Sequence, residues 1–131
     1  MDKENTNVSP RSLSVKLYQI IPEEANKGIL FEEYEVVRAA FKERSLSEIY
    51  QNVFDGQLDV KEIEDVFYIF NCNQPTGYAG RSMSVSDIVV FEYCDGRKTA
   101  FFCARFGFKI IATWRNGQWE EVLHYRLLDD K

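Results

Sequence analysis

The first apolar pattern in the chain is an alternation that predicts a β-strand over residues 14–21. One face of this strand would carry Val15, Leu17, Gln19 and Ile21. Pro22 cannot donate a ladder hydrogen bond, so the strand should end there. The next apolar residues, Ile29 to Phe31, suggest a short second strand.

Two later segments have the spacing of amphipathic helices. Tyr34, Val37 and Phe41 predict a helix from about Glu33 to Lys42. A clearer helix should follow Asp59, which can cap it, and should end near Asn71. Its apolar stripe consists of Val60, Ile63, Val66, Phe67 and Phe70.

The segment between these helices, residues 45–54, fits two structures. Ser45 and Glu48 match a capping box and favour a helix. The β-prone residues from Ile49 to Phe54 favour a strand that ends at an Asp55–Gly56 turn. The local pattern leaves both interpretations open.

The second half of the chain reads as two β-hairpins. Residues 88–91 and 99–103 are almost continuously apolar, as in strands covered on both faces, and Asp95–Gly96 lies between them. Residues 109–114 and 118–122 flank Asn116–Gly117, a strong hairpin signal. A last strand or helical turn is expected at residues 124–128.

This order predicts an α+β domain, with a curved antiparallel sheet or a partly closed barrel and two short helices packed on one side. We expect a polar, disordered tail at residues 1–13 and a single domain at residues 14–128.

Composition narrows the class of protein. The net charge of −5 over 131 residues argues against a protein that mainly neutralises nucleic-acid phosphates. The three cysteines have neither CxxC nor Cys/His ligand spacing, which predicts reduced thiols, no metal and a cytoplasmic location. No window approaches the roughly 20 apolar residues of a membrane span, and nothing in the chain calls for a cofactor.

Three segments resemble the YodL-like domain, which occurs in small bacterial proteins and in large proteins of mobile genetic elements. The segments are residues 64–71, 80–91 and 99–109, with the S-x-S-V-S-D motif at Ser82–Asp87 and the F-G-F motif at Phe106–Phe108. The resemblance favours a strand at residues 49–58. The chain departs from the family at Arg81, where His is usual, and at Ala104–Arg105, where Asp-Ser is usual. The resemblance implies no catalytic residues.

The densest polar cluster in the chain is the loop before residue 88. A functional interpretation makes it a binding site, formed by Tyr78, Arg81, Ser82, Ser84 and Asp87. The simpler interpretation is that Ser86 and Asp87 cap their own turn by bonding nearby backbone N–H groups. A serine nucleophile would need a base, and the single histidine, His124, lies far away in sequence, so no enzyme is expected.

We therefore expect a non-enzymatic module that binds a bacterial protein partner through residues 77–87, with a role against a host defence system suggested by the mobile-element setting of the family. An acidic segment at residues 55–65 could imitate DNA, although such acids usually form a solvated face. The alternative is a barrel that binds nucleic acid or a small ligand. It would use Tyr78, Arg81, Trp114 and Arg115, although Trp114 and Trp119 could simply pair across their hairpin.

Overall fold

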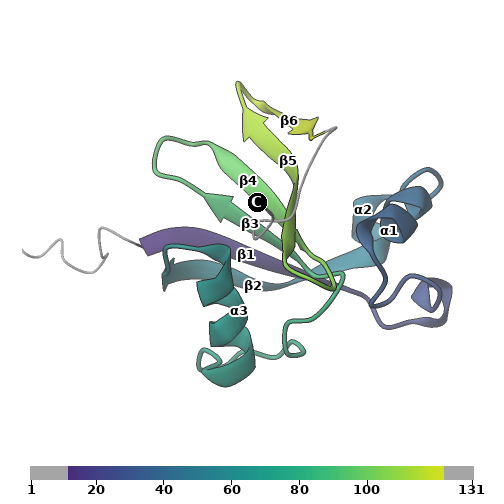
Figure 1. The fold of residues 1–131 in the computed structure, drawn as a ribbon, viewed down its shortest axis with the longest axis horizontal. Coiled ribbons are helices and arrows are strands. Elements are labelled where there is room, and N and C mark those ends of the chain that lie inside the picture. Colours follow the sequence, from purple (N-terminus) through teal and green to yellow (C-terminus); the bar gives the residue numbers. More distant parts are fainter. Residues whose placement is uncertain (1–11, 123–131) are drawn as a thin grey trace, which may run out of the picture.

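The computed structural model describes residues 12–122, which form a six-stranded antiparallel sheet with the strand order β2-β1-β3-β4-β5-β6 (Figure 1). The strands are β1 (Ser12–Ile20), β2 (Tyr50–Asp59), β3 (Ile88–Glu92), β4 (Lys98–Cys103), β5 (Phe108–Arg115) and β6 (Gln118–Glu121). The predicted antiparallel sheet is confirmed, and it is open rather than a closed barrel, because β2 and β6 are its two edges.

Three α-helices and one 3-10 turn accompany the sheet. They are η2 (Glu24–Asn26), α1 (Tyr34–Ala40), α2 (Leu46–Ile49) and α3 (Ile63–Cys72). Both interpretations of residues 45–54 are correct in part. The backbone N–H of Ser45 donates to Glu48 Oε1 at 2.9 Å and closes the capping box of α2, after which β2 begins at Tyr50.

The prediction that the helices pack on one side of the sheet is wrong, because α3 and α1 lie on opposite faces. Val66 and Phe70 of α3 pack in one core cluster with Val89 of β3. Tyr34 of α1 packs in a second cluster with Ile88 of the same strand. Side chains alternate between faces along a strand, so the nearly continuous apolar runs in β3 and β4 supply both cores.

The hairpin predictions are confirmed. Asn116 and Gly117, between β5 and β6, both have positive φ, 55° and 83°, as a type I′ turn requires. Gly96, with φ 93°, lies in the turn between β3 and β4. Gly107 lies in the tight turn between β4 and β5, where its carbonyl accepts from the N–H of Ala104 at 3.0 Å.

Three local predictions are wrong. Residues 29–31 form a turn rather than a strand, with the N–H of Ile29 donating to the carbonyl of Asn26 at 3.0 Å. Asp55 and Gly56 are paired within β2 instead of ending it. The cap of α3 is Glu62, because Asp59 is the last residue of β2, and the Asp65 carboxylate accepts from the backbone N–H groups of Lys61 and Glu62.

Other predictions fall partly or wholly outside the described residues. The expected tail at residues 1–13 overlaps β1 at Ser12 and Leu13, and its remainder lies outside. The element expected at residues 124–128 also lies outside, together with His124. The three cysteines are free thiols, and only Cys103 is buried.

We predict that Phe102→Ala lowers the free energy of unfolding by about 3–5 kcal/mol. The Phe102 ring is fully buried, and its centroid lies 5.1 Å from that of Tyr34. Phe106→Ala makes the same deletion at a side chain that is 75% exposed, so it should change stability by less than about 0.5 kcal/mol. Urea denaturation measures both, and equal losses would contradict this assignment of the core.

Candidate functional site

The predicted site residues surround Gln19 of β1, a fully buried amide. Asp87 is also fully buried, and its Oδ2 atom accepts from Gln19 Nε2 at 2.9 Å and from the backbone N–H of Ser84 at 3.0 Å. Gln19 Oε1 accepts from the backbone N–H of Arg81 at 2.9 Å. The side-chain amide of Gln19 thus joins the loop to the sheet through hydrogen bonds, where a further strand would use its backbone.

Arg81 and Tyr78 contribute to the same structure. Arg81 Nη2 donates to the carbonyl of Ile20 at 3.2 Å, and the guanidinium carbon lies 5.7 Å from the centroid of the Phe31 ring. The Tyr78 hydroxyl donates to the carbonyl of Arg81 at 2.6 Å. Ser82 is exposed and contributes its carbonyl, which lies 3.4 Å from Gln19 Nε2.

Ser86 completes the loop in a left-handed conformation, with φ 83°. Its N–H donates to the carbonyl of Cys103 at 2.9 Å, and its own carbonyl accepts from the Tyr50 hydroxyl at 2.7 Å. Its Oγ accepts from the N–H of Phe31 at 3.2 Å. These three contacts hold a conformation that is costly for a residue other than glycine.

Burial controls the electrostatics of the loop. It raises the pKa of Asp87 to about 7, against the opposing effects of the bonds from Gln19 and Ser84 and the charge of Arg81. Burial, followed by the charges of Asp87 and Glu33, raises the pKa of Cys103 to about 12. Asp87 Oδ1 and Arg81 Nε are buried and have no hydrogen-bond partner within residues 12–122. A carboxyl group that solvent does not reach suits a structural role.

The structure brings Tyr78, Arg81, Ser84 and Asp87 together around Gln19, and it does not join them to the aromatic residues of the alternative site. Arg81 contacts the carbonyl of Ile20, at one end of the sheet. Trp114 is paired with Lys98, at the opposite end of β4 from Cys103. Trp114 instead packs against Trp119, with ring centroids 5.6 Å apart, which confirms the cross-strand pair.

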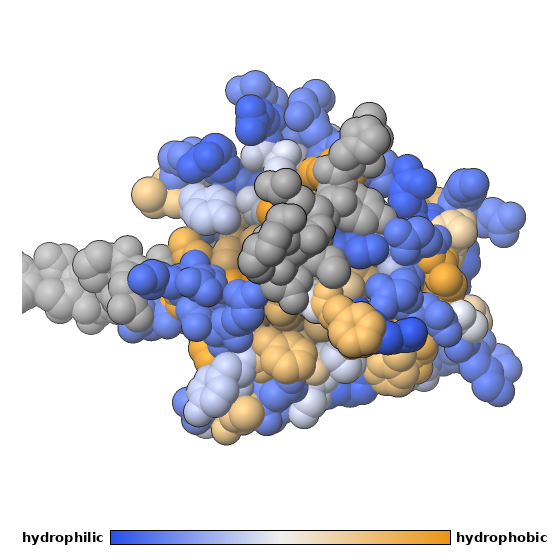
Figure 2. Space-filling model, in the orientation of Figure 1, coloured by the Kyte–Doolittle hydropathy of each residue, from blue (hydrophilic) through white to orange (hydrophobic). Residues whose placement is uncertain are grey.

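A different site lies on the α1 face of the sheet. It is an open groove of about 610 Å³, which we call the α1–sheet groove. Its lining consists of Tyr18, Tyr34, Arg38, Phe41, Lys42, Leu46, Ile88, Val90, Ala100, Ile111, Ala112, Trp119 and Glu121. Two of these side chains, Leu46 and Trp119, are 51% and 43% exposed. Figure 2 shows hydrophobic residues exposed between hydrophilic ones on one face of the molecule.

The floor of the α1–sheet groove is a row of small side chains. Val90, Ala100 and Ala112 are cross-strand partners on β3, β4 and β5. The same row continues to Lys16 on β1 and to Glu121 on β6. Alanine fills little of the space above a sheet, so the floor lies low between α1 and the Trp119 ring.

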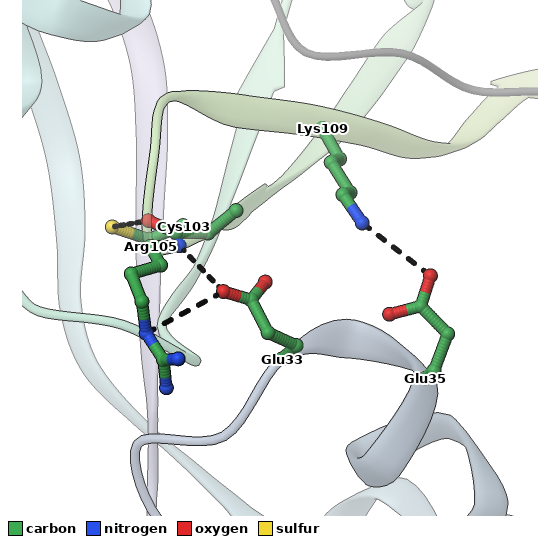
Figure 3. Close-up of polar contacts among 6 residues, drawn as sticks. Glu33, Glu35, Cys103, Arg105 and Lys109 are labelled. Carbon is green, nitrogen blue, oxygen red and sulfur yellow. Dashed lines mark hydrogen bonds and ion pairs between the residues drawn. The ribbon is translucent and has the colours of Figure 1, made fainter.

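Ion pairs hold α1 over the end of the sheet. Figure 3 shows two of them, Lys109 Nζ to Glu35 Oε2 at 3.4 Å and Arg105 Nε to Glu33 Oε2 at 3.8 Å. The backbone N–H of Arg105 also donates to Glu33 Oε2 at 3.0 Å. One partner of each pair is more than half exposed, Glu35 at 65% and Arg105 at 56%, so the pairs fix the position of α1 more than they stabilise the fold.

A third ion pair joins α1 to β6. Arg38 Nη2 donates to Glu121 Oε1 at 2.9 Å, and its Nε donates to the other carboxylate oxygen. The pKa of Glu121 is lowered mainly by the hydrogen bonds that it accepts from Arg38. Both charges of this pair are therefore engaged with each other. Lys42 is the one charged side chain of the groove without an ion-pair partner among residues 12–122.

The sequence pattern of the YodL-like domain matches residues 14–113. The chain belongs to the YodL-like domain family. The match covers the loop before β3 and the groove floor of this YodL-like domain, but not Trp119 or Glu121. Neither the curated proteins nor the solved structures contain a match to the chain.

Sequence reasoning missed the α1–sheet groove. The cross-strand alignment of Ala100 with Ala112 depends on a β-bulge between β4 and β5 that no local pattern reveals. Residues 12–122 contain no group of His, Cys, Asp or Glu side chains that could hold a metal ion, and none of their helices has the length and apolar character to cross a bilayer.

We predict that Asp87→Asn changes how stability depends on pH. The pKa of Asp87 is about 7 in the folded protein, against an ordinary value of 3.8. Between these values the unfolded chain loses a proton that the folded protein keeps, so Asp87 makes stability fall as pH rises, by about 4 kcal/mol in total. The Asn oxygen can accept the same two bonds without ionising. Relative to native protein, the variant should therefore gain stability from pH 4 to pH 8.

Urea denaturation across this pH range measures the gain. Asp95→Asn is the control, because Asp95 is an exposed turn residue and the hydrogen bond from the Arg97 N–H lowers its pKa. This variant should not gain stability relative to native protein as the pH rises. A stability difference between Asp87→Asn and native protein that stays constant with pH would refute the assignment.

Proposed function

We propose that this YodL-like domain is a non-enzymatic interaction module that binds a short segment of another protein in the α1–sheet groove. The observation that carries the proposal is the groove between α1 and Trp119, whose low apolar floor consists of Val90, Ala100 and Ala112. Folding alone does not require such an opening, since larger side chains at these positions would bury more apolar surface.

The walls of the groove suit a protein segment. Phe41 and Leu46 stand on one side and Trp119 on the other, and exposed aromatic and aliphatic side chains are typical anchors of protein interfaces. The groove volume also lies within the range of small-molecule pockets. We favour a protein segment because Leu46 and Trp119 extend the apolar surface beyond the floor, where a small molecule would leave them uncovered.

Charge specifies the partner further. The Arg38 and Glu121 side chains neutralise each other, so Lys42 supplies the available charge at the margin of the groove. A partner segment that pairs adjacent apolar side chains with a following carboxylate would fill the floor and meet the Lys42 ammonium. An acidic group next to an apolar anchor is the complement of this surface.

This proposal moves the binding surface away from the loop at residues 77–87, whose polar groups bind the sheet. It keeps the expected class of function, a protein-binding module. A bacterial partner, a role in a mobile element against host defence, and a cytoplasmic location stay predictions. Within the groove, the Tyr34 hydroxyl donates to Glu121 Oε2 at 3.3 Å, but burial raises the pKa of Tyr34 to about 12 and the bonds from Arg38 lower the pKa of Glu121, so this pair is a poor nucleophile with a poor base.

Selection from a library of random peptides of about a dozen residues, displayed on phage against the full chain, tests the proposal. We expect enriched peptides to carry two adjacent apolar residues followed by Asp or Glu. Leu46→Glu should weaken their binding at least about tenfold, since a buried carboxylate at an apolar contact costs more than 1.4 kcal/mol. Lys42→Glu should weaken the binding of peptides that carry the carboxylate more than the binding of peptides that lack it.

Two control variants make the test specific. Tyr68→Glu places the same charge on a 60% exposed side chain of α3, on the other face of the sheet, and should leave binding unchanged. Ser82→Glu alters the loop and should also leave it unchanged. Binding that survives Leu46→Glu but is lost in Ser82→Glu would assign the function to the loop. Enrichment of no peptide, with binding of a small amphipathic carboxylate instead, would make the groove a small-ligand site.

A further inference from the structure

We infer that the outer edge of β2 is a second protein-binding surface, which takes an extended segment of alternating apolar and basic side chains as a further strand of the sheet. None of the residues that line the α1–sheet groove belongs to β2, so this surface is separate from the groove. The inference therefore does not rest on the proposed function.

β2 is an open edge of the sheet. Within residues 12–122 it pairs only with β1 (Figure 1). The residues of β1 direct their N–H and C=O groups alternately to β2 and to β3, as in any antiparallel strand with two neighbours. The N–H of Ile21 donates to the carbonyl of Ile49 at 2.8 Å, so the odd-numbered residues of β1 are the ones that bond to β2.

This alternation fixes which backbone groups of β2 point outward. Val15 of β1 lies opposite Gly56, so Gly56 bonds to β1. Its neighbours Asp55 and Gln57 then direct their N–H and C=O groups away from the sheet, as does Asp59. All three of these residues are exposed. They present the hydrogen-bonding pattern that a strand added to the edge requires.

The edge lacks most of the features that prevent strand addition. Soluble proteins commonly block an exposed edge with a short strand, with Lys or Pro, or with a bulge. β2 has ten residues, more than any other strand within residues 12–122, and contains neither Lys nor Pro. The bulge of the β1–β2 pair lies between Leu17 and Tyr18, so residues 54–59 pair regularly.

The two faces of the edge specify the side chains of the added strand. Phe54 and Leu58 are half-buried and pack against the core cluster of α3. Asp55 and Gln57 point to the opposite face. Residues that lie directly opposite each other on neighbouring strands share a face. Apolar side chains of the added strand would therefore extend the core beside α3, and its basic side chains would meet Asp55.

Charge favours a basic partner over a second copy of this chain. β2 carries Asp55 and Asp59 and no basic side chain. Pairing with β2 of a second copy would therefore bring acids together with no cation in either strand. Lys16 is the cross-strand neighbour of Asp55 on β1, yet Asp55 forms no ion pair within residues 12–122. Its carboxylate is thus available to a Lys or Arg of an added strand.

Amide hydrogen exchange of the full chain, followed by NMR, tests whether the edge is open. The N–H groups of Gly56 and Leu58 bond to β1 and should exchange slowly. Those of Asp55 and Gln57 point outward and should exchange at least about tenfold faster. Equal protection of these four amides would overturn the inference.

A synthetic peptide tests the class of partner. The probe is a fluorescein-labelled peptide of about seven residues that alternates Val and Lys, titrated against the full chain by fluorescence anisotropy. We expect saturable binding that slows the exchange of the Asp55 and Gln57 amides. The same peptide with Glu in place of Lys should bind at least about tenfold more weakly. No saturable binding up to about 1 mM, or equal binding of both peptides, would overturn the inference.

Gln57→Pro and Gln57→Ala form a matched pair that isolates the backbone contribution. Proline removes the outward N–H and leaves the bonds to β1 in place, since an edge strand tolerates Pro where the N–H faces solvent. Alanine removes the same side chain and keeps the N–H. The Val/Lys peptide should bind the Pro variant at least about tenfold more weakly than the Ala variant, with similar urea midpoints. Equal binding would mean that charge alone attracts the peptide, and would overturn the inference.

Asp55→Lys keeps the backbone and reverses the charge. It should weaken the binding of the Val/Lys peptide about tenfold and strengthen the binding of the Glu peptide. Leu46→Glu, in the groove, should change neither, so the edge and the groove can fail separately. Sedimentation of the chain alone tests the other occupant. A dimer that Gln57→Pro dissociates would assign the edge to a second copy and overturn the inference.

Discussion

The hydrogen bond between Gln19 and Asp87 is the constraint on which the arrangement of the sheet depends. This bond is fully buried and joins two residues that are 68 positions apart in the sequence. It fixes the end of the loop, because β3 begins directly after Asp87. β3 therefore starts with Ile88 opposite Tyr18. A slip by one residue would move every side chain of β3 to the other face. The row from Lys16 through Val90 to Ala100, and hence the groove floor, depends on this register.

The two faces of the sheet serve different purposes because different helices cover them. Phe70 of α3 packs among aromatic rings, 5.1 Å from Phe54 and 4.9 Å from Tyr78 between centroids, and the face beneath α3 is filled. The shorter α1 packs Tyr34 against Phe102 and is joined to the sheet by ion pairs, and the alanine row forms the groove floor beside it, with Ala100 buried and Ala112 half-buried.

Much of the fold could be predicted from the sequence because its signals are local. The Asn116–Gly117 turn needs two residues with positive φ, and the stripe of α3 follows the helical period. The groove could not be predicted, because Ala100 and Ala112 become neighbours only through long-range pairing and a bulge. The polar loop was the strongest local signal, but its attachment to the sheet could not be predicted, because its partner, Gln19, lies in a strand where a polar residue looked incidental.

The remaining question is why a small domain would carry β6. A four-residue edge strand with every residue exposed buries little apolar surface, so it adds little to stability. It also leaves Trp119 43% exposed, an arrangement that selection for solubility alone disfavours. The strand does supply the wall that turns the floor of the family-matched region into a groove, and Glu121 holds Arg38 there. Under the proposed function, β6 contributes to the binding surface more than to stability, and it lies beyond the residues that the family pattern matches.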